Sequence, residues 1–590
     1  MLTITLDGMT QSVCVQASET EDAWPQIRRA IQDRTAEANI SSAERLSMPV
    51  WAFLRVRKDV GYVLQKYRVS FITDEPIRKL LERARERETL FDMARETKPI
   101  DARDVDLRLA EAGFCRNLTK FQLRNVCKLA ALPSGASFSV PGSGKTTEAL
   151  ACFAMNKTEN SKLLVVCPKN AFAVWEEQVK LCFLNPPKVV RLVGGEATIK
   201  TILMHPAVVL LITYQQLVNV TDSIAEFMLA YATMMILDES HRIKKGAEGA
   251  WAKAILKLSH LPCSKLIMSG TPMPNDVSDL LPQFDFMYPE ENADKENVIS
   301  MISPIFVRTT KAQLGLPELH RKLTLVRMKP EQRHLYELMR SEEARHLSNL
   351  NPKLRIHLRA FGKSVIRLLQ MVSNPALLAR ADINFPSELY DALADGDSPK
   401  IEYACLKARQ LAKQGSKTII WSTFVENVEL IANRLADLGA DFIHGGVEAG
   451  SEEDENTREK KIARFHEDPR AMVLVANPAA CAESISLHTV CHNALYVDRN
   501  YNAAQYLQSE DRIHRLGLPS GTITNVEILV CPDTVDESVR FRLESKVQRM
   551  ARTLNDDSLN IEPVETDLDE DGLDEEDLQD YLKHIMGKNQ

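Results

Sequence analysis

Two short segments of this 590-residue chain hold the residue types that bind and hydrolyse a nucleoside triphosphate. The first is Gly142-Ser143-Gly144-Lys145-Thr146, and the second is Asp238-Glu239-Ser240-His241. A glycine-rich turn lets backbone N–H groups approach phosphate oxygens closely. The Lys145 ammonium group would reach the terminal phosphates, and the Thr146 hydroxyl would be a ligand of Mg²⁺. The two segments together predict a site for ATP and Mg²⁺.

The acidic segment supplies groups that a phosphate loop alone lacks. Asp238 would hold Mg²⁺, mostly through water, and Glu239 would polarise the attacking water. The apolar run at 234–237 precedes them and indicates a buried parallel strand. Residues 147–154 indicate a helix directly after the first segment, so the positive end of that helix would face the phosphates. The phosphate loop departs from the strict G-x-x-x-x-G-K-T pattern at Ser139, which is still a small residue.

Composition limits the class of protein. Hydrophobic residues make up 44% of the chain and charged residues 26%, which is typical of a globular protein. Because the sequence lacks both an apolar run of ~20 residues and a signal-peptide pattern, we expect no membrane association and a cytoplasmic location. The eleven cysteines form no C-x-x-C pair, which argues against a zinc site and a disulfide framework.

The acidic charge is concentrated at the end of the sequence. Residues 556–590 contain 13 acidic residues and two lysines, a net charge of −11. The whole chain has a net charge of −8, so residues 1–555 carry +3. We expect this acidic tail to be an electrostatic regulator or a contact for a protein partner, or alternatively a solubilising segment.

Residues 1–110 are predicted to form a small accessory α+β domain. Alternating apolar residues at 2–6 and 13–15 indicate a hairpin. A strand at 69–72 precedes Thr73-Asp74-Glu75-Pro76, which is typical of a capped helix with proline in its first turn. The helix is basic, and this pattern indicates either a solvated face or contact with a nucleic-acid backbone; its basic residues are Arg78, Lys79, Arg83, Arg85 and Arg87.

Two series of apolar strands alternate with helices, which predicts two doubly wound parallel sheets. The first lies in residues 111–300 and the second in residues 400–555, while residues 301–399 are predicted to be a basic helical insertion and linker. The expected strands are Leu163–Cys167, Val208–Ile212, Met234–Leu237, Lys265–Met268, Thr418–Trp421, Met472–Ala476, Ala494–Val497 and Val526–Val530.

Over residues 112–550 the chain resembles the Swi/Snf-type ATPases of helicase superfamily 2. Eight motifs, counting the phosphate loop, occur in the order of that family. Besides the phosphate loop they are Leu118–Gln122, Leu164–Lys169 with Trp175, Thr213-Tyr214, the extended acidic box Asp238–Lys244, Ser269–Pro272 with Asn275, Ile420–Phe424, and Gln508 with Asp511–Gly517. Residues 368–375 also resemble a helical-insert segment typical of the family.

The resemblance implies a fold and a set of partners. The fold would be two RecA-like α/β lobes, the second with a C-terminal brace helix, plus the helical insertion and the N-terminal α+β domain. The activity would be a nucleic-acid-dependent ATPase with a DEAH-type acidic box. The partner would be double-stranded DNA, and we expect a monomer. Its compact size resembles prokaryotic or viral members, which implies a nucleoid-associated location or the host cytoplasm.

The same resemblance assigns roles outside the phosphate loop. Gln122 would read the adenine edge, since its amide offers one donor and one acceptor; a plain surface role is the alternative. Arg512 and Arg515 would stabilise the transition state, and their spacing predicts that they share one helix face. The alternative is a structural ion pair with Asp511 or Glu510. The residues expected to contact nucleic-acid phosphates, each with an ordinary surface role as the alternative, are Lys169, Thr213 and Ser422.

One motif departs from the family. The family's motif V is glycine-rich, whereas residues 480–487 read Ala-Cys-Ala-Glu-Ser-Ile-Ser-Leu. A motor that translocates on double-stranded DNA remains the leading hypothesis. An RNA helicase or RNA–protein remodeller is the alternative within enzymes, and a scaffold subunit switched by ATP is the alternative in another class.

Overall fold

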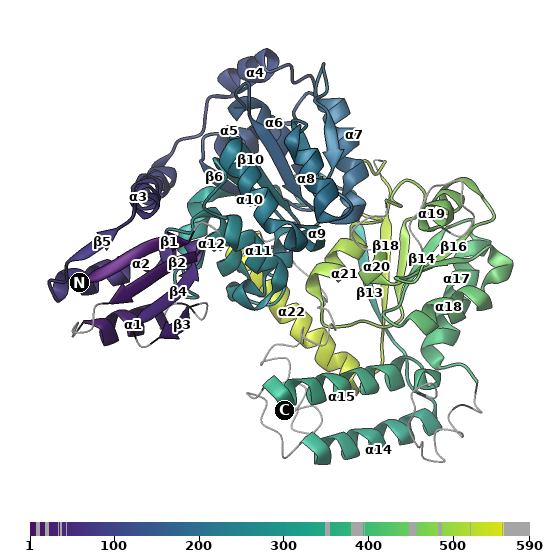
Figure 1. Ribbon diagram of the computed structural model, residues 1–590. Helices are drawn as coiled ribbons and strands as arrows, with labels where there is room; N and C mark the ends of the chain where they lie inside the picture. Colours follow the sequence, from purple (N-terminus) through teal and green to yellow (C-terminus); the bar gives the residue numbers. More distant parts are fainter. Residues whose placement is uncertain are drawn as a thin grey trace. The chain divides into compact units, whose positions relative to one another are not determined.

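The computed structural model describes residues 1–7, 12–17, 23–32, 35, 38–42, 44–347, 355–378, 393, 396–447, 457–481, 486–519, 521–556 and 559. Residues 482–485 of the altered motif V and nearly all of the acidic tail lie outside the described residues. What the sequence predicts for these two segments therefore stays a prediction. The chain divides into two compact units, which each contain one large parallel sheet (Figure 1). The first unit holds residues 1–273 and 277–309, and the second holds residues 274–276 and those from 310 onward.

The N-terminal part of the first unit is a mixed five-stranded sheet with three helices. Its strand order is β3-β4-β2-β1-β5, in which β1 and β2 form the predicted antiparallel hairpin and β5 joins β1 in parallel. Asp74 caps α3 by accepting a hydrogen bond from the Ile77 N–H at 2.9 Å, as the sequence predicts. The elements are β1 Leu2–Asp7, β2 Ser12–Ala17, α1 Trp24–Gln32, β3 Asn39–Ser42, β4 Arg45–Pro49, α2 Val50–Lys66, β5 Phe71–Thr73 and α3 Glu75–Glu96.

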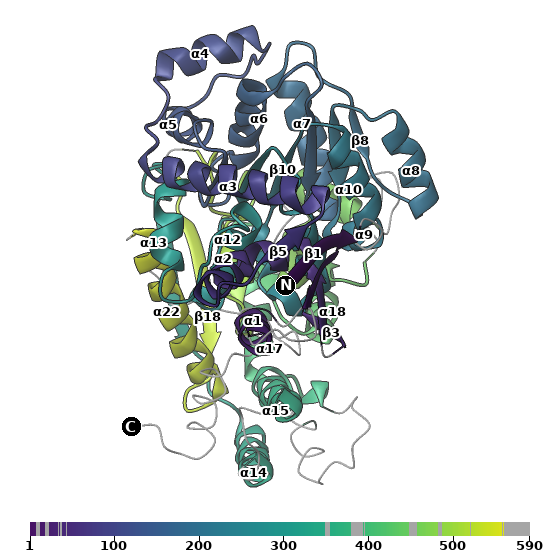
Figure 2. The ribbon, with the colours of Figure 1, turned by 60° about the vertical axis from the view of Figure 1, so that its left-hand side comes forward.

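This α+β domain is packed against helix α12 (Leu281–Met287) of the same unit (Figure 2). The ring of Phe91 on α3 lies 5.5 Å from that of Phe284 and 4.7 Å from that of Tyr288, measured between centroids. Arg55 of α2 also forms an ion pair with Asp285 at 3.1 Å. Buried aromatic contacts and a partly buried ion pair together fix the domain to the first lobe.

The first lobe is a seven-stranded sheet in which every pair of neighbours is parallel. Its order is β12-β6-β11-β10-β7-β9-β8. Its middle strands are buried runs of Val, Ile, Leu and Met, as expected for a sheet covered on both faces. The strands are β6 Ser134–Ser137, β7 Lys162–Val166, β8 Val189–Arg191, β9 Val209–Ile212, β10 Thr233–Asp238, β11 Ser264–Met268 and β12 Phe306–Val307.

Helices connect these strands and cover both faces of the sheet (Figure 1). The helices of the first lobe are α4 Ala102–Glu111, α5 Lys120–Leu129, α6 Lys145–Asn156, α7 Phe172–Cys182, α8 Glu196–Met204, α9 Tyr214–Asn219, α10 Thr221–Ala230, α11 Ala250–Leu258, α12 and α13 Val298–Ile302. The four strands predicted for this lobe are confirmed within one or two residues. Strand β6 was missed because its sequence, Ser-Gly-Ala-Ser, has no apolar pattern although all four residues are buried.

The second unit contains a six-stranded parallel sheet of order β13-β18-β17-β14-β16-β15. The four strands predicted here are also confirmed. The strands are β13 Leu319–Leu325, β14 Thr418–Trp421, β15 Asp441–Ile443, β16 Val473–Ala476, β17 Asn493–Tyr496 and β18 Thr524–Val530. The helices of this unit outside the helical insertion are α17 Pro399–Lys413, α18 Val425–Arg434, α19 Arg458–Glu467, α20 Pro478–Cys481, α21 Ala503–Glu510 and α22 Val535–Leu554.

The helical insertion consists of α14 (Pro330–Leu347) and α15 (Arg355–Ser373), which lie side by side. Gln332 of α14 donates to the Met371 carbonyl of α15 at 2.7 Å. The expected range 301–399 also contains two sheet strands, because β12 completes the first sheet and β13 begins the second. The fold is therefore the predicted pair of parallel-sheet α/β lobes with a helical insertion and an N-terminal α+β domain.

Candidate active site

The phosphate-loop segment connects strand β6 to helix α6 at the carboxyl edge of the first sheet. Gly142 and Gly144 have positive φ angles of 81° and 87°. A Cβ atom on Gly144 would lie 2.1 Å from Gln122 Nε2, so only glycine fits there. Among the described residues, no side chain caps the first turn of α6, which is the arrangement found where an anion takes that place.

Gln122 joins helix α5 to this loop. Its Oε1 accepts from the Thr119 N–H at 2.9 Å in a capping box, and its Nε2 donates to the Ser143 carbonyl at 3.1 Å. Each end of a primary amide can make a second hydrogen bond, so these contacts are compatible with the predicted contact to adenine. Lys145 Nζ donates to the Ser139 carbonyl at 2.9 Å, which places its ammonium group along the loop.

The acidic box begins at the last residue of β10, the strand that lies two places from β6 in the same sheet. Asp238 Oδ2 accepts from Trp175 Nε1 at 3.0 Å, and its carbonyl accepts from the Tyr214 hydroxyl at 2.8 Å. Glu239 adopts a left-handed conformation with φ 53° and ψ 53°. That conformation costs a non-glycine residue roughly 1–2 kcal/mol, and such strain is concentrated at functional sites.

His241 connects the acidic box to the segment after β11. Its Nδ1 lies 3.0 Å from Ser269 Oγ and 3.4 Å from Glu239 Oε2. Burial, reinforced by the nearby cations Arg242 and Lys244, holds the pKa of His241 well below its usual value. The imidazole is therefore neutral at pH 7, and its contact with Glu239 is a polar contact between a neutral ring and a carboxylate.

Two further contacts tie the segment after β11 into the site. The Ser240 hydroxyl donates to Gln283 Oε1 at 2.6 Å, and Gln283 Nε2 donates to the Pro272 carbonyl at 2.6 Å. A Cβ atom on Gly270 would lie 2.7 Å from Pro141 Cδ, so this glycine allows the segment to touch the phosphate loop. The three predicted segments at 138–146, 238–244 and 269–272 are thus brought together in one lobe.

A buried polar network beneath the phosphate loop was not predicted. Asn125 Nδ2 donates to Glu148 Oε1 at 2.8 Å and to Thr309 Oγ1 at 3.0 Å, and the Ser137 hydroxyl donates to Glu148 Oε2 at 3.0 Å. Ser139 Oγ accepts from the Thr309 N–H at 3.0 Å. Although Asn125 and Ser137 donate to it, burial raises the pKa of Glu148 to about 7.

This network explains why Ser139 stands where the phosphate-loop pattern has glycine. Its hydroxyl accepts a hydrogen bond inside the lobe, which a glycine hydrogen could not do. It joins α5, α6 and Thr309, the last residue of the first unit. Two sequence signals could have indicated it: a serine at a glycine position, and a glutamate inside an otherwise apolar helix.

The residues predicted to contact nucleic acid differ in their exposure. Lys169 is exposed in the turn after β7, and Thr213 is half-buried at the start of α9, after β9. Thr213 Oγ1 already accepts from the Gln216 N–H at 3.1 Å as a helix cap. Ser422 is fully buried, and its hydroxyl donates to Asp498 at 2.6 Å. Its hydroxyl is thus used in the core of the second lobe, and the expected contact of Ser422 with a phosphate stays a prediction.

The two candidate arginines of the second unit lie just after helix α21. The helix ends at Glu510, and residues 511–515 are not helical. The prediction that Arg512 and Arg515 share one helix face is therefore wrong. Arg512 Nε donates to the Gln508 carbonyl at 2.8 Å, and burial lowers the pKa of Arg515.

The carboxylates proposed as alternative partners for these arginines have other cations. Glu510 makes a two-bond contact with Arg321, with distances of 2.8 Å from Nε and Nη2, and also lies 3.2 Å from Lys311 Nζ. Asp511 lies 2.6 Å from Lys311 Nζ. The ion pairs of Glu510 and Asp511 with Arg321 and Lys311 were not predicted from the sequence.

Family models match both lobes of this chain. A model described as the SNF2-related domain matches residues 138–297, and one described as the helicase conserved C-terminal domain matches residues 401–517. These two parts of the chain are thus similar to the domains of SNF2-related helicases.

Individual relatives of this SNF2-related chain are distant. It is 26% identical over 367 residues to the putative ATP-dependent helicase/translocase YwqA of Bacillus subtilis, covering 58% of this chain and 37% of that protein. It is 22% identical over 450 residues to a probable global transactivator of Orgyia pseudotsugata multicapsid polyhedrosis virus, covering 72% of this chain and 87% of that one. The chain spans between 31% and 37% of the length of the first three curated relatives.

A solved structure is also similar to the SNF2-related chain. It is the SWI2/SNF2 ATPase core of Sulfolobus solfataricus in complex with double-stranded DNA, with 20% identity and a TM-score of 0.32. The match covers 75% of this chain and 94% of that one.

The part of motif V that is described contacts Arg515. The Ser486 hydroxyl lies 3.4 Å from Arg515 Nη1 and 3.0 Å from His488 Nδ1. The Ser486 carbonyl is also 2.8 Å from His466 Nε2. Ser486 is therefore in contact with one of the candidate arginines.

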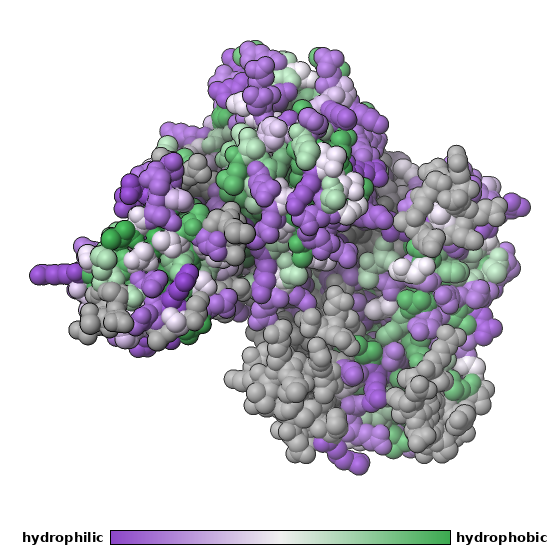
Figure 3. All heavy atoms as spheres, in the orientation of Figure 1, coloured by the Kyte–Doolittle hydropathy of each residue, from purple (hydrophilic) through white to green (hydrophobic). Residues whose placement is uncertain are grey.

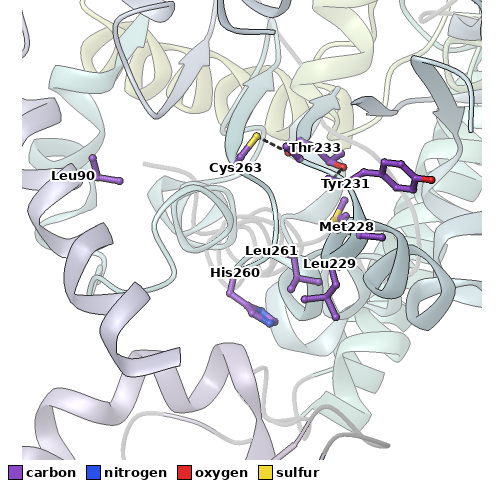
Figure 4. Close-up of a pocket in the computed structure, with 10 residues that line it drawn as sticks. Leu90, Met228, Leu229, Tyr231, Thr233, His260, Leu261 and Cys263 are labelled. Atoms are coloured by element: carbon purple, nitrogen blue, oxygen red, sulfur yellow. Dashed lines mark hydrogen bonds between the residues drawn. The ribbon is translucent and has the colours of Figure 1, made fainter. Parts of the chain in front are cut away.

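Figure 4 shows a pocket in the first unit of this SNF2-related chain that lies away from the phosphate loop. Its volume is about 400 Å³, and it is lined by residues at the starts of β10 and β11, among them Thr233 and Cys263. Because the phosphate loop follows the carboxyl end of β6 in the same parallel sheet, this pocket is at the opposite edge. Within the described residues, every helix is too short or too polar to cross a membrane.

Proposed function

We propose that this chain is a nucleic-acid-dependent ATPase that couples ATP hydrolysis to movement on double-stranded DNA. The observation that carries the proposal is the meeting of the phosphate loop, the acidic box and the segment after β11 at one edge of one sheet. Hydrogen bonds through His241 and Gln283, and the close packing of Gly270 on Pro141, make these three segments one assembly.

The residues at this edge fit ATP and Mg²⁺. Two glycines with positive φ precede the first turn of α6, a Cβ atom on Gly144 would meet Gln122, and the Ser143 hydroxyl is buried there without a hydrogen-bond partner in the described chain. Thr146 and Asp238 supply two oxygen donors, which suits a cation that keeps most of its water ligands. When bound, magnesium would neutralise charge on the phosphates.

In this proposal the chain's own residues divide the work between the lobes. Lys145 would leave the Ser139 carbonyl to contact the terminal phosphates, Gln122 would contact adenine, and Glu239 would accept a proton from the attacking water. Arg512 and Arg515 would stabilise negative charge in the transition state. Because the arginines belong to the second unit, turnover would require the two lobes to close, which gives nucleic acid a way to control hydrolysis.

Several observations support DNA as the activator. The SNF2-related family match and the helicase/translocase name of the Bacillus relative support a motor of this kind. Lys169 and Thr213 follow strands β7 and β9 at the same sheet edge as the site, where side chains could contact a phosphate backbone. Their contacts would position the duplex and would not read its sequence.

The decisive experiment measures ATP hydrolysis by the full chain with duplex DNA, single-stranded DNA and RNA of equal length as separate activators. We expect duplex DNA to give the largest stimulation, and Glu239→Gln to abolish it in the same preparation. Equal or greater stimulation by RNA would identify an RNA-dependent enzyme. ATP binding without hydrolysis under every condition would identify a scaffold switched by ATP.

A further inference from the structure

A second charged surface lies on the N-terminal domain, outside the proposed motor site. A groove of about 510 Å³ runs between α2, α3 and β5, and its lining includes Arg57, Lys58, Arg68 and Arg85. Among the described residues that line it, there is no carboxylate. Figure 3 shows hydrophobic surface beside hydrophilic surface on this domain, in the left part of the view. Lys58 is paired with Glu291 at 3.5 Å, and Arg57 donates to the Glu290 carbonyl at 2.9 Å. The groove thus presents Arg68 and Arg85 beside apolar surface.

An exposed aromatic ring forms part of the groove. Phe71, the first residue of β5, lines it and is 52% exposed. Tyr62 and Tyr67, near the end of α2, are 65% and 44% exposed. β5 is an edge strand that pairs only with β1 in the described sheet. Exposed aromatic rings beside cations are the combination with which proteins hold single-stranded nucleic acid, since bases stack on the rings while cations follow the backbone.

Arg68 has a backbone conformation that is unfavourable for residues other than glycine. Its φ is 53°, and the Val69 N–H donates to the Leu64 carbonyl at 2.9 Å, so Arg68 follows the end of α2 in the left-handed conformation that usually belongs to glycine. An arginine there costs roughly 1 kcal/mol relative to glycine. Strain of this kind points to a function for the side chain.

We propose that this groove binds a short segment of single-stranded DNA. Arg68 and Arg85 contact its phosphates, and a base stacks on Phe71. The inference goes beyond the proposed motor, because it concerns a surface on the N-terminal domain and needs no nucleotide. Since the domain is fixed to the first lobe by Phe91 and Arg55, a strand held here would stay at a constant position relative to that lobe.

The test measures fluorescence anisotropy of labelled oligo(dT) of roughly a dozen nucleotides with the full chain and no ATP. Phe71→Ala should weaken binding about tenfold through loss of stacking. Arg85→Gln should weaken it several-fold and reduce the slope of log affinity against log salt by about 0.7. Arg68→Gly should also weaken binding while raising the thermal midpoint or leaving it unchanged, because glycine relieves the backbone strain. Unchanged oligo(dT) affinity in all three variants would overturn the proposal.

Matched controls lie on α3 outside the groove. Arg95→Gln removes the same charge as Arg85→Gln, and Met93→Ala shortens another exposed apolar side chain. Both should bind oligo(dT) like the parental chain, and equal losses in the controls would overturn the assignment of the groove. All groove variants should retain hydrolysis stimulated by saturating duplex DNA, because the motor site is untouched.

Two other ligands of the groove, duplex DNA and an acidic peptide, would give different results in the same binding assay. A duplex that binds as tightly as oligo(dT) and is insensitive to Phe71→Ala would overturn the single-strand assignment. A synthetic peptide of residues 560–590 tests an acidic segment. If Arg68→Gly and Arg85→Gln weakened binding of this peptide and left oligo(dT) unchanged, the groove would be a site for acidic protein.

Discussion

Asn125 Nδ2 lies 2.8 Å from Glu148 Oε1, which joins helix α5 to helix α6 directly beneath the phosphate loop. Both side chains are buried, and the bond is one of three that Asn125 Nδ2 makes, with Ser139 and Thr309 as the other partners. The loop therefore rests on a polar network that links its first residues to the end of the first unit.

Removing Asn125 should loosen the loop. Asn125→Ala would leave Glu148 with one fewer donor, and we expect a loss of about 1–3 kcal/mol in the free energy of unfolding. We also expect a higher KM for ATP with a smaller change in kcat, since the network positions the loop and does not touch the reacting atoms. Denaturant titration and steady-state ATPase assays measure the two effects. Asn156→Ala, at the exposed end of α6, is the control, and an equal loss there would contradict the prediction.

Glu239→Gln should separate binding from turnover. The amide keeps the shape of the side chain and removes the base, so we expect ATP affinity to be retained and hydrolysis to fall by about 10²–10⁴. Lys145→Ala should weaken ATP binding as well. Equilibrium binding of a fluorescent ATP analogue and phosphate release are the measurements. The exposed Glu159 provides a control through Glu159→Gln. Hydrolysis by Glu239→Gln at the parental rate would mean that another group is the base.

Arg515 should be needed for catalysis more than for folding. Arg515→Ala is expected to lower kcat by about 10³ or more if its guanidinium stabilises the transition state, with little change in the unfolding midpoint. Arg515→Lys should not restore the rate, because an ammonium group lacks the planar fork of donors. Arg470→Ala, whose side chain is 88% exposed, is the control. A fall in stability that matches the fall in rate would assign Arg515 to structure.

The second unit should be sensitive to acid through Glu510. Burial raises the pKa of this carboxyl, but Arg321 and Lys311 outweigh burial and hold it well below its usual value near 4.5. A carboxyl with a lowered pKa in the folded state stabilises the fold above pH 4.5, and this stabilisation is lost as the pH falls further. Unfolding free energies measured between pH 7 and pH 3 should show that loss.

Glu510→Gln tests the same ion pairs at neutral pH. It should lower the free energy of unfolding by about 3–5 kcal/mol, because two half-buried cations lose the buried carboxylate that they share. The variant should also lose most of the acid dependence. Glu467→Gln, on the exposed face of α19, should behave like the parental chain at both pH values. A stable Glu510→Gln variant would contradict the prediction.

Deleting the acidic tail should strengthen DNA binding. Removal of residues 560–590 takes away most of the −11 charge and keeps the buried residues Asp556 and Leu559. If the tail competes with DNA for basic surface, the gain should be largest at low salt, since ions screen this competition. The affinity for duplex DNA, measured over a range of salt concentrations with and without the tail, shows whether the tail competes with DNA. An affinity that is unchanged over the range would leave the tail as a solubilising segment or a contact for a protein partner.

The sequence alone was sufficient to predict the strands and loops that have strong local patterns. The runs at 163–167, 234–237 and 472–476 are apolar over their whole length because both faces of a central parallel strand are buried, so they could be recognised without a structure. The glycines of the phosphate loop and the Asp-Glu pair were equally recognisable, since their chemistry depends on residue type and local spacing. These features fixed the fold class and the candidate nucleotide site.

Tertiary contacts decided the features that depend on residues far apart in the chain. Strand β6 has no apolar pattern, and it is a strand because β11 and β12 pair with its two edges. Ser422, just after β14, is buried and donates to Asp498, which lies just after the neighbouring strand β17. Glu510 is paired with Arg321 and Lys311, which are nearly two hundred residues away in the chain. Pairing partners of this kind leave no local signal, since only the folded chain brings them within hydrogen-bonding distance.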